Sequence, residues 1–260
     1  MFSKGEEFRV DTTAYLERIG YRGSVAPTAE TLRQLQLAHL LSVPFENLSI
    51  HAGEPIVLDD DALFDKIVAR KRGGFCYELN GLFAALLRVL GFNVEMLSAA
   101  VWREAGEFGP EFDHMALLVT LGERWLVDVG FGDSFVEPLL LDERAEQVQG
   151  VRAYRIDEDG DRLVLMQRGQ AGGWEAQYRF GLQPHGYADF AGMCHYHQTS
   201  PESHFTRRRV CSLLTGEGRV TIGQMRLIIT RGNKREEREL ASEEEYAGAL
   251  REHFGIMMPG

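Results

Sequence analysis

A change in hydrophobic spacing at Gly91 constrains the fold of this chain most. Before that residue, apolar side chains recur at the spacing of one helix face. After it, short β-rich runs alternate with turn residues. The chain therefore divides into a helical first third and a remainder that is mostly strands. Short strands joined by turns predict an antiparallel barrel or sandwich, so we expect a fold of the α+β class.

Caps and breakers delimit the expected elements. Thr28 is a cap candidate, three acids open the segment at 59–61, and Gly91 is a helix stop. Helices are expected at residues 11–19, 28–41, 59–69, 76–90, 187–199 and 242–254. Strands are expected at residues 93–103, 114–121, 124–129, 136–141, 148–156, 162–168, 174–182, 209–214, 219–222 and 224–230. The charged run at 234–239 (KREERE) is expected to be a solvated turn.

Net charge and the lack of long apolar runs argue against several partners. The chain of 260 residues has 28 basic and 39 acidic side chains, a formal charge of −11. Its average field repels nucleic acid, and an anionic small ligand would need a local basic patch. No apolar run approaches the roughly 18 residues of a membrane span, and the first eleven residues lack the apolar segment of a signal peptide. We therefore expect neither a nucleic acid nor a membrane as partner.

The cysteines bear on the compartment and on metal binding. Cys76, Cys194 and Cys211 are an odd number and form no CxxC spacing. This argues against a disulfide scaffold and a structural zinc site, and it favours a reducing cytoplasm. The run CHYH at 194–197 does not match a common zinc pattern, so no metal is expected.

Cys76 follows a Gly-Gly pair in the stretch RGGFCYELN (72–80) and opens an apolar helical pattern. One interpretation is packing, since free cysteine is among the most buried residue types. The other is a reactive thiolate, because the dipole at a helix N-terminus lowers a thiol pKa. Two other segments of the chain help to decide between them.

A nucleophilic cysteine needs a base, and the base needs a group that holds its tautomer. His114 opens a strand in FDHMALLV (112–119), and Asp128 lies near the end of the next strand in WLVDVGFG (125–132). Because the two residues flank one hairpin, they are expected side by side within hydrogen-bonding reach. An acid between two valines is costly to bury unless it has such a partner.

Five segments together resemble the arylamine N-acetyltransferase family. The stretches RGGFCYELN, FDHMALLV and WLVDVGFG are similar to its three catalytic motifs, in the family's order. VPFENLSIH (43–51) resembles the family's Pro-Phe-Glu-Asn-Leu segment, and TSPESHF (199–205) resembles its Ser-His-Phe segment. The resemblance spans roughly residues 40 to 205, and five matches in order are far more specific than any one of them.

The resemblance implies an acetyltransferase that uses acetyl-CoA as donor. Its acceptors would be arylamines, arylhydrazines or N-hydroxyarylamines. Cys76 would accept the acetyl group, His114 would be its base, and Asp128 would hold His114. Transfer in two steps through acetyl-cysteine predicts ping-pong kinetics.

The resemblance also implies an architecture with a cysteine-protease-like Cys-His-Asp core. A helical bundle (1–91) would carry the nucleophile, and a central β-barrel (92–186) would carry the histidine and the aspartate. An interdomain helix and linker (187–208) would lead to a C-terminal α/β lid (209–260).

Ligand contacts are expected around the loop that follows Asp128. The glycines of this loop permit close approach of a ligand and its phenylalanine offers an aromatic face. The expected contacts with CoA are Gly130, Phe131, Gly132, Trp102 and Phe205, and those with the aryl acceptor are Phe45 and Phe131. The basic run at 207–209 is either a phosphate contact or an exposed turn. Glu46 and Asn47 are expected to be structural.

Two departures from the family pattern bear on these expectations. The hairpin LGER (121–124) is one residue shorter than is usual between the histidine and the aspartate, but a trimmed turn leaves both strands intact. Asp113 precedes the histidine where the family often has a small hydroxyl residue, which affects the expected donor contacts.

Three other functions remain open from the sequence. An amide synthase of the same fold would share the three residues and act on a carrier-bound polyketide. A cysteine hydrolase with a papain-like or transglutaminase-like triad would not explain PFENL, GFG and SHF together. A binding module with an inactive triad is disfavoured because all three residues are present.

Overall fold

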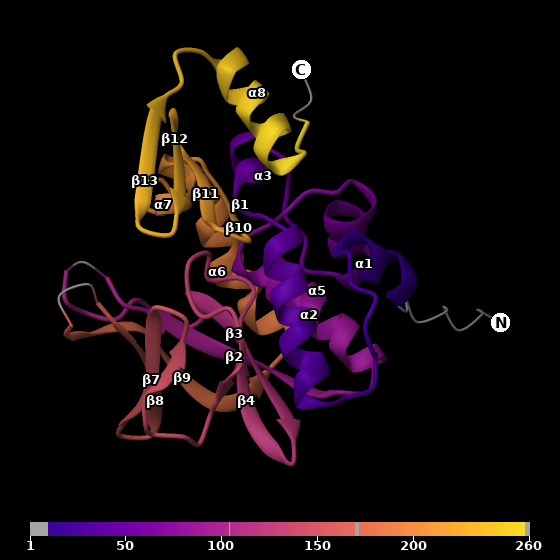
Figure 1. Cartoon of the computed structure of the whole chain (residues 1–260), viewed down its shortest axis with the longest axis vertical. Coiled ribbons are helices and arrows are strands. Elements are labelled where there is room, and N and C mark those ends of the chain that lie inside the picture. The colour runs from indigo at the N-terminus through magenta and orange to yellow at the C-terminus, as the bar shows by residue number, and fades with distance from the viewer. Residues whose placement is uncertain (1–9, 104, 170–171, 258–260) are drawn as a thin grey trace.

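Two antiparallel sheets and a group of N-terminal helices make up the protein (Figure 1). The structure is a computed structural model that describes residues 10–103, 105–169 and 172–257. In Figure 1 the smaller sheet, which contains β10 to β13, lies above the larger sheet, and most of the N-terminal helices lie to the right of both. Residues 1–9, within the segment that lacks a signal-peptide pattern, are outside the described residues. None of the described helices is long and apolar enough to cross a membrane.

The N-terminal helices begin at side-chain caps. Asp11, Thr28 and Asp59 each accept a hydrogen bond from the first turn of the helix that follows. The helices are α1 (Thr12–Arg18), α2 (Ala29–Ser42), α3 (Leu48–His51), α4 (Asp60–Phe64) and α5 (Cys76–Val89). The helix expected at 59–69 is instead α4 followed by a π-helical turn, η1 (Asp65–Ala69).

Helix α5 is buried on all sides, which explains its nearly continuous apolar sequence. Every residue from Cys76 to Leu87 is buried. The helix packs against strands of the larger sheet, with its leucines and Phe83 in the largest apolar core. A central buried helix fixes the position of its own first residue, Cys76.

The larger sheet has eight antiparallel strands in the order β5-β4-β3-β2-β9-β8-β7-β6 and forms a nearly closed barrel. Its strands are β2 (Asn93–Val101), β3 (His114–Leu121), β4 (Glu123–Val127), β5 (Leu139–Leu140), β6 (Gln147–Gln149), β7 (Arg152–Asp159), β8 (Arg162–Arg168) and β9 (Trp174–His185). The side-chain amide of Gln147 bonds both the N–H and the C=O of Leu140. Gln149 likewise bonds the backbone at Val136 and Glu137. These two glutamine side chains thus connect the ends of the sheet, at β5 and β6, across the gap in the barrel.

Two expected strands of this sheet differ from the sequence prediction. The run at 148–156 is two strands, because the chain turns at Gly150, where φ is +63°. That left-handed conformation favours glycine. The strand expected at 136–141 shortens to Leu139–Leu140.

The smaller sheet has the order β1-β10-β11-β12-β13. Its strands are β1 (Phe45–Glu46), β10 (Val210–Thr215), β11 (Gly218–Gly223), β12 (Arg226–Arg231) and β13 (Lys234–Glu239), and α8 (Glu243–Phe254) shares its apolar core. Helices α6 (Tyr187–Thr199) and α7 (His204–Arg207) connect the two sheets. The solvated turn predicted at 234–239 is wrong, because KREERE is the fully exposed edge strand β13.

Candidate active site

Cys76 is the first residue of α5 and is buried, with 3 % of its surface exposed. The two glycines before it allow strand β1 to lie against this turn. A Cβ atom at Gly73 would lie 1.9 Å from the carbonyl oxygen of Pro44. The N–H of Glu46 donates to the carbonyl of Gly74 over 2.8 Å. Close backbone packing therefore requires a glycine at position 73, and the Glu78 side chain leaves no room for a Cβ atom at Gly74.

Two buried ion pairs hold the segment around Cys76. Arg72 contacts Glu46 at 2.9 Å, and Lys66 contacts Glu78 at 2.7 Å. Each carboxylate also accepts a backbone hydrogen bond, from Leu48 and from Phe75 respectively. Burial raises the pKa of Glu78, and Lys66 opposes that rise.

Asn47 joins the same region to the connection between the two sheets. Its side chain donates to the carbonyls of Phe205 and Arg208 and accepts from the N–H of Val210. Glu46 and Asn47 therefore have the structural contacts expected from the sequence.

His114 and Asp128 lie side by side, as the hairpin predicts. His114 Nε2 is 2.7 Å from Asp128 Oδ2, and both residues are buried. His114 is the first residue of β3, and Asp128 comes directly after the last residue of β4. The shortened turn therefore does not move the carboxylate to the wrong face. With Nε2 engaged, the other nitrogen of the ring, Nδ1, is left to act as a base.

Asn80 is a site residue that the sequence reasoning missed. Its side-chain amide donates to Asp128 Oδ1 over 2.9 Å and to the carbonyl of Met115 over 2.7 Å. Its oxygen accepts from the N–H of Val129 over 2.9 Å. The signal was present in the sequence, since an asparagine four residues after Cys76 shares its helix face within an apolar run.

The expected depression of the Cys76 thiol pKa is wrong. Burial raises that pKa well above its ordinary value, a backbone hydrogen bond from Met115 opposes the rise, and the charge of Asp128 adds to it. Burial therefore opposes loss of the Cys76 thiol proton to solvent. Transfer of the proton to His114 keeps the total charge unchanged, and burial penalises such an ion pair less than a lone thiolate.

Tyr178 packs beside the pair formed by His114 and Asp128. Its ring centroid lies 5.1 Å from that of His114 and 5.2 Å from that of Phe131. Burial and the nearby Asp128 carboxylate raise the pKa of Tyr178. The ring thus closes one side of the histidine and keeps solvent away from it.

A cavity of about 740 Å³ gives access to the cysteine and the histidine. Its lining includes most of the side chains expected to touch ligands: Phe45, Cys76, Trp102, His114, Gly130, Phe131 and Phe205. Gly132 is not part of this lining, although a Cβ atom there would lie 3.7 Å from the Phe45 ring. Arg207 and Arg208 also line the cavity.

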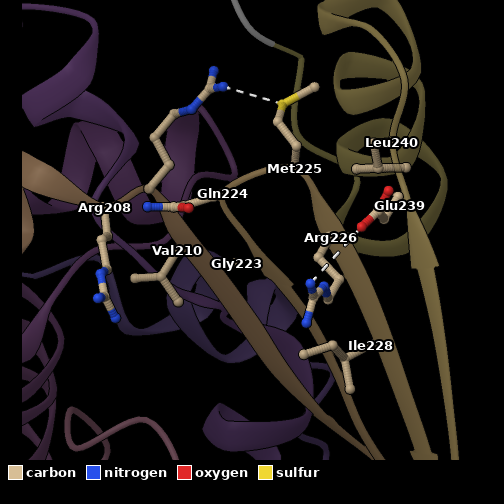
Figure 2. Close-up of a pocket in the computed structure, with 10 residues that line it drawn as sticks. Arg208, Val210, Gly223, Gln224, Met225, Arg226, Ile228, Glu239 and Leu240 are labelled. Atoms are coloured by element: carbon tan, nitrogen blue, oxygen red, sulfur yellow. Dashed lines mark hydrogen bonds and ion pairs between the residues drawn. The ribbon is translucent and has the colours of Figure 1, made fainter.

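A second cavity, of about 750 Å³, lies along the C-terminal sheet and shares Arg208 and Val210 with the first. Figure 2 shows these two residues on one side of it, with Arg226 and Ile228, both of β12, across from them. Of the basic run, Arg209 pairs with Glu243 at 2.7 Å. The Arg208 side chain makes no hydrogen bond or ion pair with the described residues, so it is free to meet an anion.

Helix α6 places the residues of the CHYH run in different environments. Cys194 is buried and accepts a hydrogen bond from Gln198, His195 is exposed, and His197 is buried against Asp113. In the described part of the chain, no three His, Cys, Asp or Glu side chains are grouped as metal ligands.

Comparison with known proteins gives consistent matches over nearly the whole chain. The N-acetyltransferase family profile matches residues 28–259. An arylamine N-acetyltransferase of Mycobacterium tuberculosis is 35% identical over 254 residues, covering 95% of this chain and 89% of the relative. The arylamine N-acetyltransferase structure from Salmonella typhimurium matches with a TM-score of 0.90 at 30% identity, covering 96% of this chain and 92% of that one. The Mycobacterium marinum enzyme in complex with CoA matches with a TM-score of 0.88 at 34% identity, covering 95% and 93%.

Proposed function

The chain belongs to the arylamine N-acetyltransferase family, and we propose that Cys76, His114 and Asp128 carry out its acetyl transfer. It is an acyltransferase that moves an acetyl group from acetyl-CoA to the nitrogen of an arylamine, arylhydrazine or N-hydroxyarylamine. The observation that carries the residue assignment is the 2.7 Å contact between His114 and Asp128 in the wall of the cavity that Cys76 also lines.

The first half-reaction moves the acetyl group to the protein. His114 Nδ1 takes the proton of the Cys76 thiol, and the thiolate attacks the thioester carbonyl of acetyl-CoA. The bond between the carbonyl carbon and the CoA sulfur breaks, and the CoA thiolate takes the proton back from His114. Asp128 stabilises the imidazolium that forms between these two steps.

The second half-reaction releases the amide. The unprotonated arylamine attacks the acetyl carbon of acetyl-Cys76, and His114 takes a proton from its nitrogen. The thioester bond to Cys76 breaks, and the thiolate receives that proton. The sum is arylamine plus acetyl-CoA giving acetylated arylamine plus CoA thiol, with no external acid or base consumed.

The cavity supports a shared binding site for the two substrates. We assign Phe45 and Phe131 to the aryl ring, whose flat face suits an aromatic wall. Trp102, Phe205 and the Gly130–Gly132 loop are assigned to CoA. Arg208, at the junction of the two cavities, is a candidate partner for a CoA phosphate. Because both substrates use one cleft, CoA has to leave before the acceptor enters.

We also propose a cytoplasmic location and a division of the chain into four parts. The odd number of cysteines, all three of them free and buried, supports a cytoplasmic enzyme. The division into residues 1–91, 92–186, 187–208 and 209–260 follows the positions of the two sheets. The macrolactam amide synthase and the cysteine hydrolase are not favoured, because the similar proteins are named as arylamine N-acetyltransferases.

The decisive experiment follows the acyl intermediate. Incubation with acetyl-CoA and no amine should place one acetyl group on Cys76, detected by intact mass and peptide mapping. Addition of arylamines or arylhydrazines should remove it, with release of acetylated product. The Cys76→Ala variant should lose turnover, while Cys194→Ala and Cys211→Ala retain it. If acetyl-CoA is not consumed but a carrier-bound acyl chain is processed, the amide synthase replaces this proposal.

A further inference from the structure

A second histidine–aspartate pair lines the catalytic cavity and takes no part in the mechanism above. His197 Nε2 lies 3.1 Å from Asp113 Oδ1. The exposed fractions are 2 % for His197 and 8 % for Asp113. Asp113 directly precedes His114, and His197 comes from α6. A buried ionisable pair beside a nucleophile changes the electrostatic field in which that nucleophile titrates.

Both ring nitrogens of His197 face oxygen atoms. Nδ1 lies 3.0 Å from Ser203 Oγ in hydrogen-bond geometry, whereas Nε2 is within ion-pair distance of the carboxylate but outside hydrogen-bond geometry. A doubly protonated ring can donate to the serine oxygen, which also accepts, and attract the carboxylate by its charge. The Tyr77 ring stacks on the imidazole at 6.2 Å between centroids, and the Phe205 ring meets it edge-on at 5.1 Å. The geometry therefore suits an imidazolium held in place by aromatic rings.

The other ionisable groups near the pair offset the negative charge of Asp113 only weakly. Arg103 approaches it to 3.7 Å, but its side chain is 48 % exposed, so solvent screens that charge. His204 lies 6.0 Å from His197 between ring centroids, and burial, followed by the charge of His197, lowers the pKa of His204. Although burial opposes the effect, the nearby His197 lowers the pKa of Asp113. His197 is thus the closest buried partner of this carboxylate.

The charge of Asp113 reaches the nucleophile. Asp113 lines the same cavity as Cys76, and its charge, like that of Asp128, opposes the Cys76 thiolate, while a backbone hydrogen bond from Met115 favours it. Asp128 is balanced when His114 takes the proton. Asp113 has no equivalent in the reaction, so an unbalanced charge there would hinder each formation of the thiolate.

We propose that His197, as an imidazolium paired with Asp113, is a positioning residue that offsets the Asp113 charge and keeps Cys76 reactive near neutral pH. The inference rests on the proposed function in taking Cys76 as the nucleophile. It gives the pair an electrostatic role that neither member would have alone.

The test measures the rate of Cys76 alkylation by iodoacetamide against pH, in the absence of acetyl-CoA. The variants are His197→Gln, Asp113→Asn and the double variant. A glutamine can accept from Ser203 and place its NH₂ group toward Asp113, so it removes the charge while keeping a polar side chain at both positions. His195→Gln, at an exposed position of the same helix, is the matched control.

We expect His197→Gln to shift the alkylation midpoint and the added Asp113→Asn substitution to reverse that shift. His197→Gln raises the midpoint of the alkylation profile by about one pH unit, since a like charge near the thiol is then unbalanced. The double variant returns to the wild-type midpoint, Asp113→Asn does not raise it, and His195→Gln leaves it unchanged. An unmoved midpoint in His197→Gln, or a failure of the double variant to restore it, overturns the proposal. An equal rise in Asp113→Asn would make the pair merely structural and also overturns it.

A measurement on the wild-type protein covers the case in which a variant does not fold. Nitrogen-15 chemical shifts of the His197 ring at pH 7 should be those of a doubly protonated imidazolium, and a neutral ring would refute the inference. Alkylation does not require acetyl-CoA, so these results are independent of acetyl transfer. If Cys76 alkylates as expected but never carries an acetyl group, only the proposed function fails.

Discussion

Asn80 donates a hydrogen bond over 2.9 Å to Asp128 Oδ1, while His114 contacts the other oxygen of the same carboxylate. The N–H of Gly130 also donates to Oδ1, over 2.8 Å. The helix that begins at Cys76 is thereby bonded to the carboxylate that contacts His114. One asparagine thus fixes the helix of the proposed nucleophile relative to the histidine–aspartate pair.

Asn80→Ala should reduce both stability and turnover. It leaves the buried Asp128 carboxylate, the Met115 carbonyl and the Val129 N–H each short of one partner, which should lower the free energy of unfolding by about 2–3 kcal/mol. Urea unfolding and acetyl-transfer kinetics measure the two effects. Asn93→Ala, at an exposed position, should change neither. Wild-type kinetics in a destabilised Asn80→Ala protein would limit Asn80 to folding.

Asp128→Asn should retain the fold and lose about 10⁴-fold in kcat. The Asn80 amide and the Gly130 N–H both donate to Oδ1, so the oxygen of the new amide takes that place and its NH₂ faces His114. Nε2 must then accept a hydrogen bond, the ring proton moves to Nδ1, and the base can no longer take the thiol proton. Single-turnover acetylation measures the loss.

The exposed carboxylate of Asp142 offers a control for that variant. Asp142→Asn should keep wild-type turnover, because Asp142 pairs with Arg124 at the surface of the barrel. Near wild-type activity in Asp128→Asn would transfer the role of Asp128 to Asp133 or Asp113.

Several elements and the catalytic pair could be predicted because their signals are local. Thr28 caps α2 and Ser242 caps α8, so both helices begin within one residue of the expected position. His114 and Asp128 flank a single hairpin, and the register of two paired strands fixes their proximity.

Other features could not be predicted because they depend on partners distant in the sequence. KREERE has no apolar alternation, yet it pairs with β12 as an edge strand, which needs one neighbour and no buried face. Gln147 and Gln149 close the barrel through side-chain amides that no hydrophobic pattern encodes. The raised pKa of Cys76 follows from burial by the whole fold, whereas the sequence displays only the helix start.

Gly130→Ala should impair folding or catalysis. A Cβ atom there would lie 2.8 Å from the Cα atom of Cys76 and 2.7 Å from the Asn80 amide nitrogen, so the loop has to move away from the helix. Thermal melting and acetyl transfer should both fall. Gly192→Ala is the matched control, since its added methyl group meets nothing within 4 Å, and it should not lower the melting temperature. An unchanged Gly130→Ala enzyme would show that the loop shifts freely.

Asp133→Asn should remove a pH-dependent contribution to stability that comes from contacts between the two sheets. Asp133 contacts Arg152 of the barrel at 2.7 Å and Arg219 of the smaller sheet at 3.1 Å. Although burial opposes it, these arginines lower the pKa of Asp133. A lowered pKa in the folded state gives stability that is present above the unfolded value, about 4, and is lost as the pH falls.

The wild-type protein should therefore lose more stability between pH 7 and pH 3 than the Asp133→Asn variant does. Urea midpoints at both values measure the difference, which should be modest because the carboxylate is half-exposed. Equal losses in both proteins would mean that the two arginine contacts contribute nothing in solution.

The two-residue strand β1 has a consequence for the order in which the enzyme is assembled. Phe45, in the wall of the catalytic cavity, pairs with Ser212 of β10, and Asn47 bonds the backbone of Val210. A ribosome delivers the chain from its N-terminus, so Cys76 and His114 emerge well before these partners. A nascent chain that stops after the barrel would thus contain Cys76, His114, Asp128 and Phe45 but lack the strand that holds Phe45 in the cavity wall. The cleft is finished only when synthesis has nearly ended.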